Sequence, residues 1–272
     1  MTVLRCITSL FLLLMSPKAL AADYSDGNIR KNDYKWFQFN LYQSFDNKLP
    51  FNNKKDTFFE MEFGGRSGVF DAYGFLDVFD VLNTPNSDLH NEDNLFLKFV
   101  PRFSIDGMAK SDLSLGPIKE WYLASMFIVG DRALFQQYVG IGTDVEIPWF
   151  GKTVANLMAR YVRENFGAAN ENKWDGVLLD IAWFKSFYTF ADKTYLTYQG
   201  YFDYTFGATK ISSDPFYSDS SIEWYNGLYW HSVHYAAGYG LKYYKDMGLV
   251  QSGGVAGDTT GFGHYLVVTY KF

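Results

Sequence analysis

Charged and aromatic residues recur at every second position in several short segments of this chain, and these side chains could do chemistry. In the segment 69–79, Asp71, Tyr73, Phe75 and Asp77 alternate with small and apolar residues. Carboxylates and cations can hydrogen-bond to hydroxyl groups, and aromatic faces can stack on flat rings. Around an opening, such groups would bind a small polar solute weakly, as conduction requires. The residues predicted to line a pore and contact its solute are Trp36, Glu60, Glu62, Asp71, Tyr73, Phe75, Asp77, Lys98, Arg102, Arg160, Tyr201 and Asp203.

Catalytic chemistry is not supported by the four histidines, His90, His231, His234 and His264. A hydrolase needs a nucleophile, a base and an orienting group in reach of the substrate. His231 and His234 flank Ser232 at a predicted turn, away from any external substrate. No His/Cys cluster has the spacing of a zinc site. We therefore predict no enzyme activity, no metal and no cofactor.

The predicted elements that carry these residues are β-strands, because the pattern has period two rather than the period of a helix. Trp36, Gln38 and Asn40 fall on one face of their segment, and the apolar residues between them fall on the other. The expected strands are 34–45, 57–64, 69–79, 95–105, 117–129, 136–147, 153–163, 175–186, 194–206, 222–231, 233–244 and 261–272. An even number of such segments predicts an all-β fold, a twelve-stranded antiparallel transmembrane β-barrel of the outer-membrane type.

Composition excludes a helical membrane protein but leaves a soluble all-β protein open. Aromatic residues make up 20% of the chain, and the mean hydropathy is −0.15. We find no apolar run after the first residues that is long enough for a spanning helix. A lipid-facing barrel produces this combination, because only alternate residues meet lipid.

The lengths of the connections favour the membrane barrel over a soluble one. Short connections at 64–68, 148–152 and around residue 232 alternate with longer ones at 46–56, 80–94, 164–174, 207–221 and 245–260. Outer-membrane barrels have short periplasmic turns and longer external loops. Two connections fit less well, since 106–116 is long for a turn and 130–135 is short for a loop. The glycine-rich run 64–68 is interpreted as a turn, because no helix follows it to cradle a phosphate.

The first and last segments indicate export and membrane insertion. Residues 1–21 combine Arg5, a short apolar core and the small-residue signal Ala19-Leu20-Ala21, so we expect cleavage before Ala22. Residues 22–272 would then form a single transmembrane β-barrel domain without Cys6, the one cysteine of the chain. Cleavage leaves 22 basic and 30 acidic residues, a net charge of −8, which argues against nucleic-acid binding.

The final strand is expected to carry a further signal. It ends on Phe272 with an apolar outer face, and aromatic residues mark the membrane edge in such barrels. We expect the outer-membrane assembly machinery to bind this strand.

Two interpretations of the inward charges stay open at this point. Glu60, Glu62, Asp71 and Asp77 face the strand that carries Lys98 and Arg102, so opposite charges could simply pair and fill the barrel. Alternatively, twelve strands leave a narrow polar channel, since wide non-specific porins have more strands. The residues alone therefore predict a channel for small, ring-bearing polar solutes, or a barrel plugged by its own side chains.

Several runs resemble the nucleoside-specific channel-forming family known as Tsx, and most closely its OmpK-like branch. They are Ala22–Gly27, Lys31–Trp36, Glu60–Gly68, Asp71–Phe79, Pro101–Asp106, Tyr198–Tyr204 and Gly261–Phe272. The resemblance implies a monomeric twelve-stranded barrel in the outer-membrane bilayer that passes nucleosides and deoxynucleosides by diffusion. It also implies external loops that bacteriophages use as receptors. The alternative is a general or plugged barrel that serves mainly as a surface or phage receptor without nucleoside selectivity.

Overall fold

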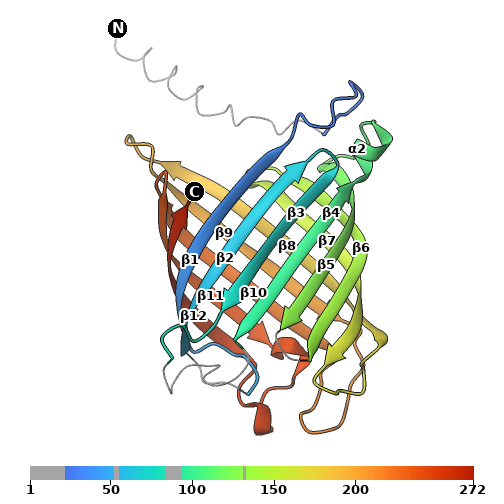
Figure 1. Cartoon of the computed structure of the whole chain (residues 1–272), viewed down its shortest axis with the longest axis vertical. Helices are drawn as coiled ribbons and strands as arrows, with labels where there is room; N and C mark the ends of the chain where they lie inside the picture. Colours follow the sequence, from blue (N-terminus) through green and yellow to red (C-terminus); the bar gives the residue numbers. More distant parts are fainter. Residues whose placement is uncertain (1–21, 52–54, 84–93, 131–132) are drawn as a thin grey trace, which may run out of the picture.

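The structure is a computed structural model that describes residues 22–51, 55–83, 94–130 and 133–272. Its strands form one closed antiparallel barrel in which every strand pairs with its sequence neighbours and β1 pairs with β12 (Figure 1). The prediction of a twelve-stranded barrel is confirmed. The strands are β1 (Tyr34–Phe45), β2 (Lys55–Ser67), β3 (Phe70–Val78), β4 (Leu95–Ser104), β5 (Ile118–Gly130), β6 (Leu134–Ile147), β7 (Gly151–Asn165), β8 (Lys173–Thr189), β9 (Tyr195–Phe206), β10 (Ser220–His231), β11 (Tyr235–Lys245) and β12 (Gly261–Lys271).

The two faces of each strand differ in the way that the alternating sequence predicts. In β12, Leu266 and Val268 are 52% and 56% exposed, whereas Val267 and Thr269 between them are 3% and 6% exposed. Successive side chains of a strand point to opposite faces of the sheet. The exposed apolar residues therefore lie on the outer wall, and the residues between them point into the barrel.

The glycine-rich run at residues 64–68 is mostly strand, so its interpretation as a turn is wrong. Gly64 to Ser67 end β2, and the chain turns only at Gly68, whose φ is +61°. At Gly64, a Cβ atom would lie 2.6 Å from the Trp36 ring, so this glycine makes room for a side chain. Because Gly64 to Ser67 belong to β2, Arg66 lies within this strand, and its side chain points into the barrel.

The two ends of the barrel differ in their connections (Figure 1). One end carries the short turns, α2 (Ile105–Ala109), residues 22–33 and the C-terminus, and we call it the turn end. The opposite end carries the longer connections, including the short helices η1 (Met247–Leu249) and η2 (Gly254–Ala256), and we call it the loop end. The long connection at 106–116 thus holds α2, which Ser104 caps by accepting the Gly107 N–H at 2.9 Å. Over the described ranges, no helix is long and apolar enough to cross a membrane.

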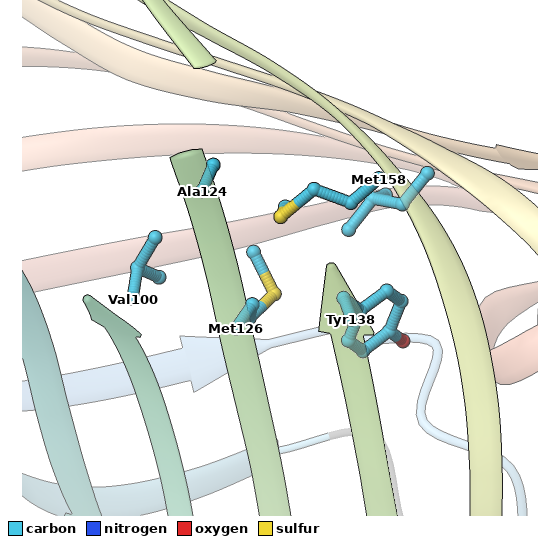
Figure 2. Packing of buried hydrophobic residues seen from close by; sticks show 6 residues of the cluster. Val100, Ala124, Met126, Tyr138 and Met158 are labelled. Carbon is cyan, nitrogen blue, oxygen red and sulfur yellow. The ribbon is translucent and has the colours of Figure 1, made fainter. Parts of the chain in front are cut away.

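Part of the barrel interior is a packed apolar core. Residues of β4 to β8 form this methionine cluster: Val100, Ala124, Met126, Tyr138, Met158 and Leu178 (Figure 2). Met126 and Met158 are fully buried. Because protein interiors pack as densely as organic crystals, this side of the interior excludes water. The open space of the barrel therefore lies elsewhere.

Candidate functional site

The side chains of the predicted site residues all point into the barrel, but they lie in four separate places. Trp36, Glu60, Glu62, Tyr73, Phe75 and Asp77 share one wall. Asp71 and Arg102 lie near the turn end, and Lys98, Tyr201 and Asp203 meet across the barrel. Arg160 lies near the loop end. The four groups have different partners and are described in turn.

The first group combines water-exposed rings with a hydrogen-bonded carboxylate. Trp36 on β1 and Tyr73 on β3 are 38% and 36% exposed, and their ring centroids are 6.2 Å apart. The Tyr73 hydroxyl donates to Glu62 at 2.8 Å. Glu62 also accepts from the side-chain amides of Gln38 at 2.5 Å and Asn40 at 3.0 Å. We call Trp36, Gln38, Asn40, Glu62 and Tyr73 the β1–β3 wall.

Two further carboxylates extend this wall toward the loop end. Glu60 accepts from Asn40 at 2.6 Å and lies opposite Asp77 in the pairing of β2 with β3. Phe75 lies between the Tyr73 and Phe96 rings, with centroids 6.2 Å and 6.0 Å away. Glu62 accepts hydrogen bonds from two amides and a phenol, and Glu60 accepts one from an amide and lies beside the Asp77 carboxyl. The wall can therefore offer acceptors and ring faces to a solute.

Near the turn end, the inward charges form a buried network. Arg102 donates to Asp71 through Nε at 2.9 Å and Nη2 at 2.7 Å, and to Asp144 at 3.2 Å. The Tyr122 ring lies 4.0 Å from the Arg102 guanidinium, and its hydroxyl donates to Asp144 at 2.9 Å. Opposite charges on neighbouring strands thus do pair here, as one sequence interpretation proposed. This network fills space, and its charges satisfy one another once Lys152, which pairs with Asp144 at 2.7 Å, is included.

The same end holds a second buried pair that the sequence did not indicate. Arg66 donates to both carboxylate oxygens of Glu120, at 2.6 Å and 2.8 Å, and both side chains are 4% exposed. Ser104 donates to Glu120 at 2.5 Å. Arg66 was missed because its run resembled a turn. Extending the alternating pattern of β2 by two residues would have placed Arg66 on the inward face.

Residues 22–33 are attached to this network through Tyr24. Tyr24 is fully buried, its hydroxyl donates to Glu120 at 3.3 Å and accepts from Asn32 at 2.9 Å, and its ring lies 5.4 Å from the Arg66 guanidinium. Burial raises the pKa of Tyr24 to about 12. The Gly68 N–H donates to Asp33 at 2.7 Å. The segment therefore packs against the turn end of the barrel.

The third group joins opposite walls. Lys98 on β4 forms ion pairs with Asp203 on β9 at 2.9 Å and Asp180 on β8 at 3.4 Å. The suggested pairing of Lys98 with Glu60, Glu62 or Asp77 is therefore wrong, because the lysine extends away from its own neighbours. The Tyr201 ring lies near two ammonium groups, with Lys98 Nζ 5.5 Å and Lys242 Nζ 5.3 Å from its centroid.

Arg160 belongs to the support of the loop end rather than to the walls just described. It donates to Gln136 at 3.0 Å and pairs with Asp175 at 3.4 Å. Asp175 in turn accepts from Asn170 at 2.7 Å and from the Thr209 N–H at 2.7 Å. Arg160 thus ties together the strands and connections at this end.

Rings on β9, β10 and β12 pack face to face or edge to face, and of these residues only Tyr201 was among the predicted site residues. Tyr195 stacks on His231 with centroids 4.8 Å apart, and Tyr201 stacks on Tyr225 at 5.8 Å. Tyr225 also contacts the Tyr265 ring at 6.0 Å. We call these five residues the aromatic track.

The track continues toward the loop end and depends on glycines beside it. Tyr265 contacts Tyr42, which stacks on Phe58 at 4.8 Å. At Gly240, a Cβ atom would lie 2.1 Å from the Tyr225 hydroxyl, so the Tyr225 ring lies flat against the backbone of β11. The sequence signal for this arrangement was the pair of inward glycines at 238 and 240, whose backbone the Tyr229 and Tyr225 rings cover.

Metal chemistry finds no support in the described ranges, where no group of three or more His, Cys, Asp or Glu residues could hold a metal ion. His231 has Thr197 and Lys271 as its polar neighbours, at 3.0 Å and 3.5 Å. His90 lies outside the described residues. What the described interior side chains offer to a solute is hydrogen bonds, ion pairs and ring faces.

Comparison with known proteins places these observations in a family. The model of the family "Nucleoside-specific channel-forming protein, Tsx" matches residues 31–272. Outer membrane protein OmpK of Vibrio parahaemolyticus serotype O3:K6 (strain RIMD 2210633) is 46% identical over 265 residues, which cover 94% of this chain and 95% of OmpK. Nucleoside-specific channel-forming protein Tsx of Salmonella typhimurium (strain LT2) is 31% identical over 255 residues, 87% of this chain and 88% of that protein.

Among solved structures, a KdgM porin in complex with disordered oligogalacturonate gives a TM-score of 0.46 at 8% identity, covering 86% of this chain and 99% of the porin. This likeness is too small to add to the argument.

The curated relatives are named as outer-membrane or channel-forming proteins rather than as enzymes. Together with the closed barrel and its apolar outer face, they show an outer-membrane channel, so the predicted localisation is confirmed. Because outer-membrane barrels have short periplasmic turns and longer external loops, we expect the turn end to face the periplasm and the loop end to face the exterior. The chain belongs to the Tsx family of nucleoside-specific channel-forming proteins.

Proposed function

We propose that this channel passes nucleosides and deoxynucleosides across the outer membrane by diffusion. The observation that carries the proposal is the β1–β3 wall, where two exposed rings lie beside a carboxylate and two amides. Trp36 and Tyr73 offer faces on which a nucleobase can stack. Glu62, which already accepts three hydrogen bonds, has the lone pairs to accept from ribose hydroxyls in exchange.

The β1–β3 wall suits a solute that binds weakly and is released quickly. Its contacts are neutral amides, a phenol and one carboxylate, and the rings are open to water. Each ring contact contributes about 0.5–1.5 kcal/mol, so the site binds weakly and releases quickly. The printed names of the Tsx relatives support the choice of nucleosides, at 31% identity.

Uptake into proteoliposomes tests the proposal. Vesicles that contain the protein should admit labelled adenosine faster than a disaccharide, and Trp36→Ala should reduce adenosine selectivity by about 2–10-fold. The matched control is Trp224→Ala, because Trp224 on β10 is 44% exposed and packs against Phe202. The register of β10 places the Trp224 side chain on the outer wall, whereas the side chain of its neighbour Tyr225 points into the barrel. Equal uptake of adenosine and disaccharide by the unaltered protein would reject nucleoside selectivity.

The other properties implied by the resemblance stay predictions. These are the use of the external loops as bacteriophage receptors, the monomeric state, and recognition of the strand ending at Phe272 by the assembly machinery. Cleavage before Ala22 also stays a prediction, because residues 1–21 lie outside the described part of the chain.

A further inference from the structure

Lys98 crosses the barrel to reach its partners. In the closed strand order, β9 is five strands from β4 in one direction and seven in the other, so the two strands are almost diametrically opposed. Figure 1 shows β4 on the near wall and β8, β9 and β10 behind it. Nevertheless Lys98 Nζ lies 2.9 Å from Asp203 and 3.4 Å from Asp180. One side chain therefore bridges the interior from wall to wall.

The Lys98 and Asp203 side chains can meet only if the barrel is flattened along the line from β4 to β9. A circular barrel of twelve strands, spaced about 4.8 Å apart and tilted by about 40°, has a backbone diameter of about 24 Å. An extended lysine and an aspartate joined by an ion pair span at most about 13 Å between their Cα atoms. Since the second length is about half of the first, β4 and β9 must approach each other well inside the circular diameter.

The bridge divides the interior into two unequal sides. The smaller side, bounded by β5 to β8, contains most of the methionine cluster, whose side chains Figure 2 shows gathered together. Ala124, Met126 and Met158 there are fully buried, so no water reaches them. The larger side, bounded by β10 to β12 and β1 to β3, carries the exposed Trp36 and Tyr73 rings. The larger side therefore offers rings and polar groups to solvent.

The bridge also holds together carboxylates that would otherwise repel. Asp180 and Asp203 are direct partners in the pairing of β8 with β9, and like charges in that position destabilise a sheet. The Lys98 ammonium contacts both, and Asn156 donates to Asp180 at 2.7 Å. The three charged side chains are 8–16% exposed, so the pair is poorly screened by water. Such a contact is costly to break.

We propose that Lys98 is a specificity-determining strut that sets the bore of the channel. By tying β4 to β8 and β9, it keeps the β5–β8 side closed and confines solutes to the slot between β10–β12 and β1–β3. The slot admits solutes that are thin in one dimension, such as a single planar ring system with a small polar substituent. The inference depends on the barrel being a channel and does not depend on nucleosides being its solute.

The strut can be tested in planar bilayers by measuring which sizes of neutral polymer enter the channel. The size limit reports the width of the bore and does not depend on the charge of the lumen. Lys98→Met should raise single-channel conductance roughly twofold and admit larger polyethylene glycols, since the slot opens toward the second side. Asp180→Asn combined with Asp203→Asn removes the anchors while keeping the lysine, and it should shift both quantities in the same direction. Lys98→Arg should retain the bridge and the narrow bore.

The control for lost charge is Lys210→Met. Lys210 pairs with Asp219 in an exposed contact, 65% and 47% exposed, so its loss should leave the bore unchanged. Heat-dependent mobility in gels establishes that each variant is folded. If Lys98→Met does not fold, the double aspartate variant carries the test alone. Folded anchor variants with unaltered polymer exclusion would overturn the strut.

Adenosine measurements separate this inference from the proposed function. Loss of adenosine block in Lys98→Met at constant polymer exclusion would overturn the strut and leave nucleoside passage standing. A wider bore in Lys98→Met, with no adenosine block in the unaltered protein, would support the strut and reject nucleoside selectivity.

Discussion

The buried Arg66–Glu120 pair provides the sharpest stability prediction, through the substitution Glu120→Gln. Two short hydrogen bonds of 2.6 Å and 2.8 Å join the side chains, each 4% exposed. Removing the carboxylate charge leaves the guanidinium buried without a counter-charge. Breaking such a pair costs about 3–5 kcal/mol, or roughly a thousandfold in the folding equilibrium constant.

The paired substitution distinguishes an ion pair from simple packing. Arg66→Met combined with Glu120→Met removes both charges, and replacement of a buried pair by apolar residues is commonly neutral or stabilising. We therefore expect the double variant to recover most of the stability lost in Glu120→Gln. Lys210→Met, which breaks an exposed pair, should have no measurable effect.

Reversible urea unfolding in detergent micelles, followed by tryptophan fluorescence, measures these differences. A loss below about 1 kcal/mol in Glu120→Gln would place the pair among weak surface contacts and refute the reasoning. A double variant less stable than Glu120→Gln would also refute it, because the stability would then depend on shape rather than on charge compensation.

Three further predictions concern other parts of the barrel. Gly240→Val should displace the Tyr225 ring into the lumen, because even a Cβ atom would lie 2.1 Å from its hydroxyl, and single-channel conductance should fall. Arg102→Met should cost about 3–5 kcal/mol of unfolding free energy, because it leaves the buried Asp71 without its cationic partner and leaves Asp144 paired only with the half-exposed Lys152. Burial raises the pKa of Tyr24 from 10.0 to about 12, so the native state holds the phenol proton more tightly than the unfolded chain does. Attachment of residues 22–33 should therefore be complete below pH 10 and weaken between pH 10 and 12, measured by limited proteolysis, with no such transition in Tyr24→Phe.

The alternating pattern was sufficient to predict the barrel, because period-two alternation reflects which face of each strand meets lipid. The same pattern indicated the inward position of residues such as Glu62 and Tyr73. It could not indicate partners, because those depend on how a closed barrel brings distant strands together. Lys98 illustrates this limit, since its partner Asp203 is 105 positions away and lies on the opposite wall.

Glycines account for much of what the pattern missed. Gly64 and Gly240 occupy strand positions where a neighbouring ring covers the backbone, whereas in a sequence glycine usually suggests a turn. Arg66 was overlooked for this reason. Long-range ring packing thus explains residues that local turn rules misassign.

Conductance in planar bilayers, titrated with adenosine, tests nucleoside passage most directly. Because the solute and the ions share one narrow slot, adenosine should reduce the current in a saturable way, and Trp36→Ala should shift half-block to a higher adenosine concentration. A current that adenosine leaves unchanged at every concentration, in folded and conducting protein, would contradict the account.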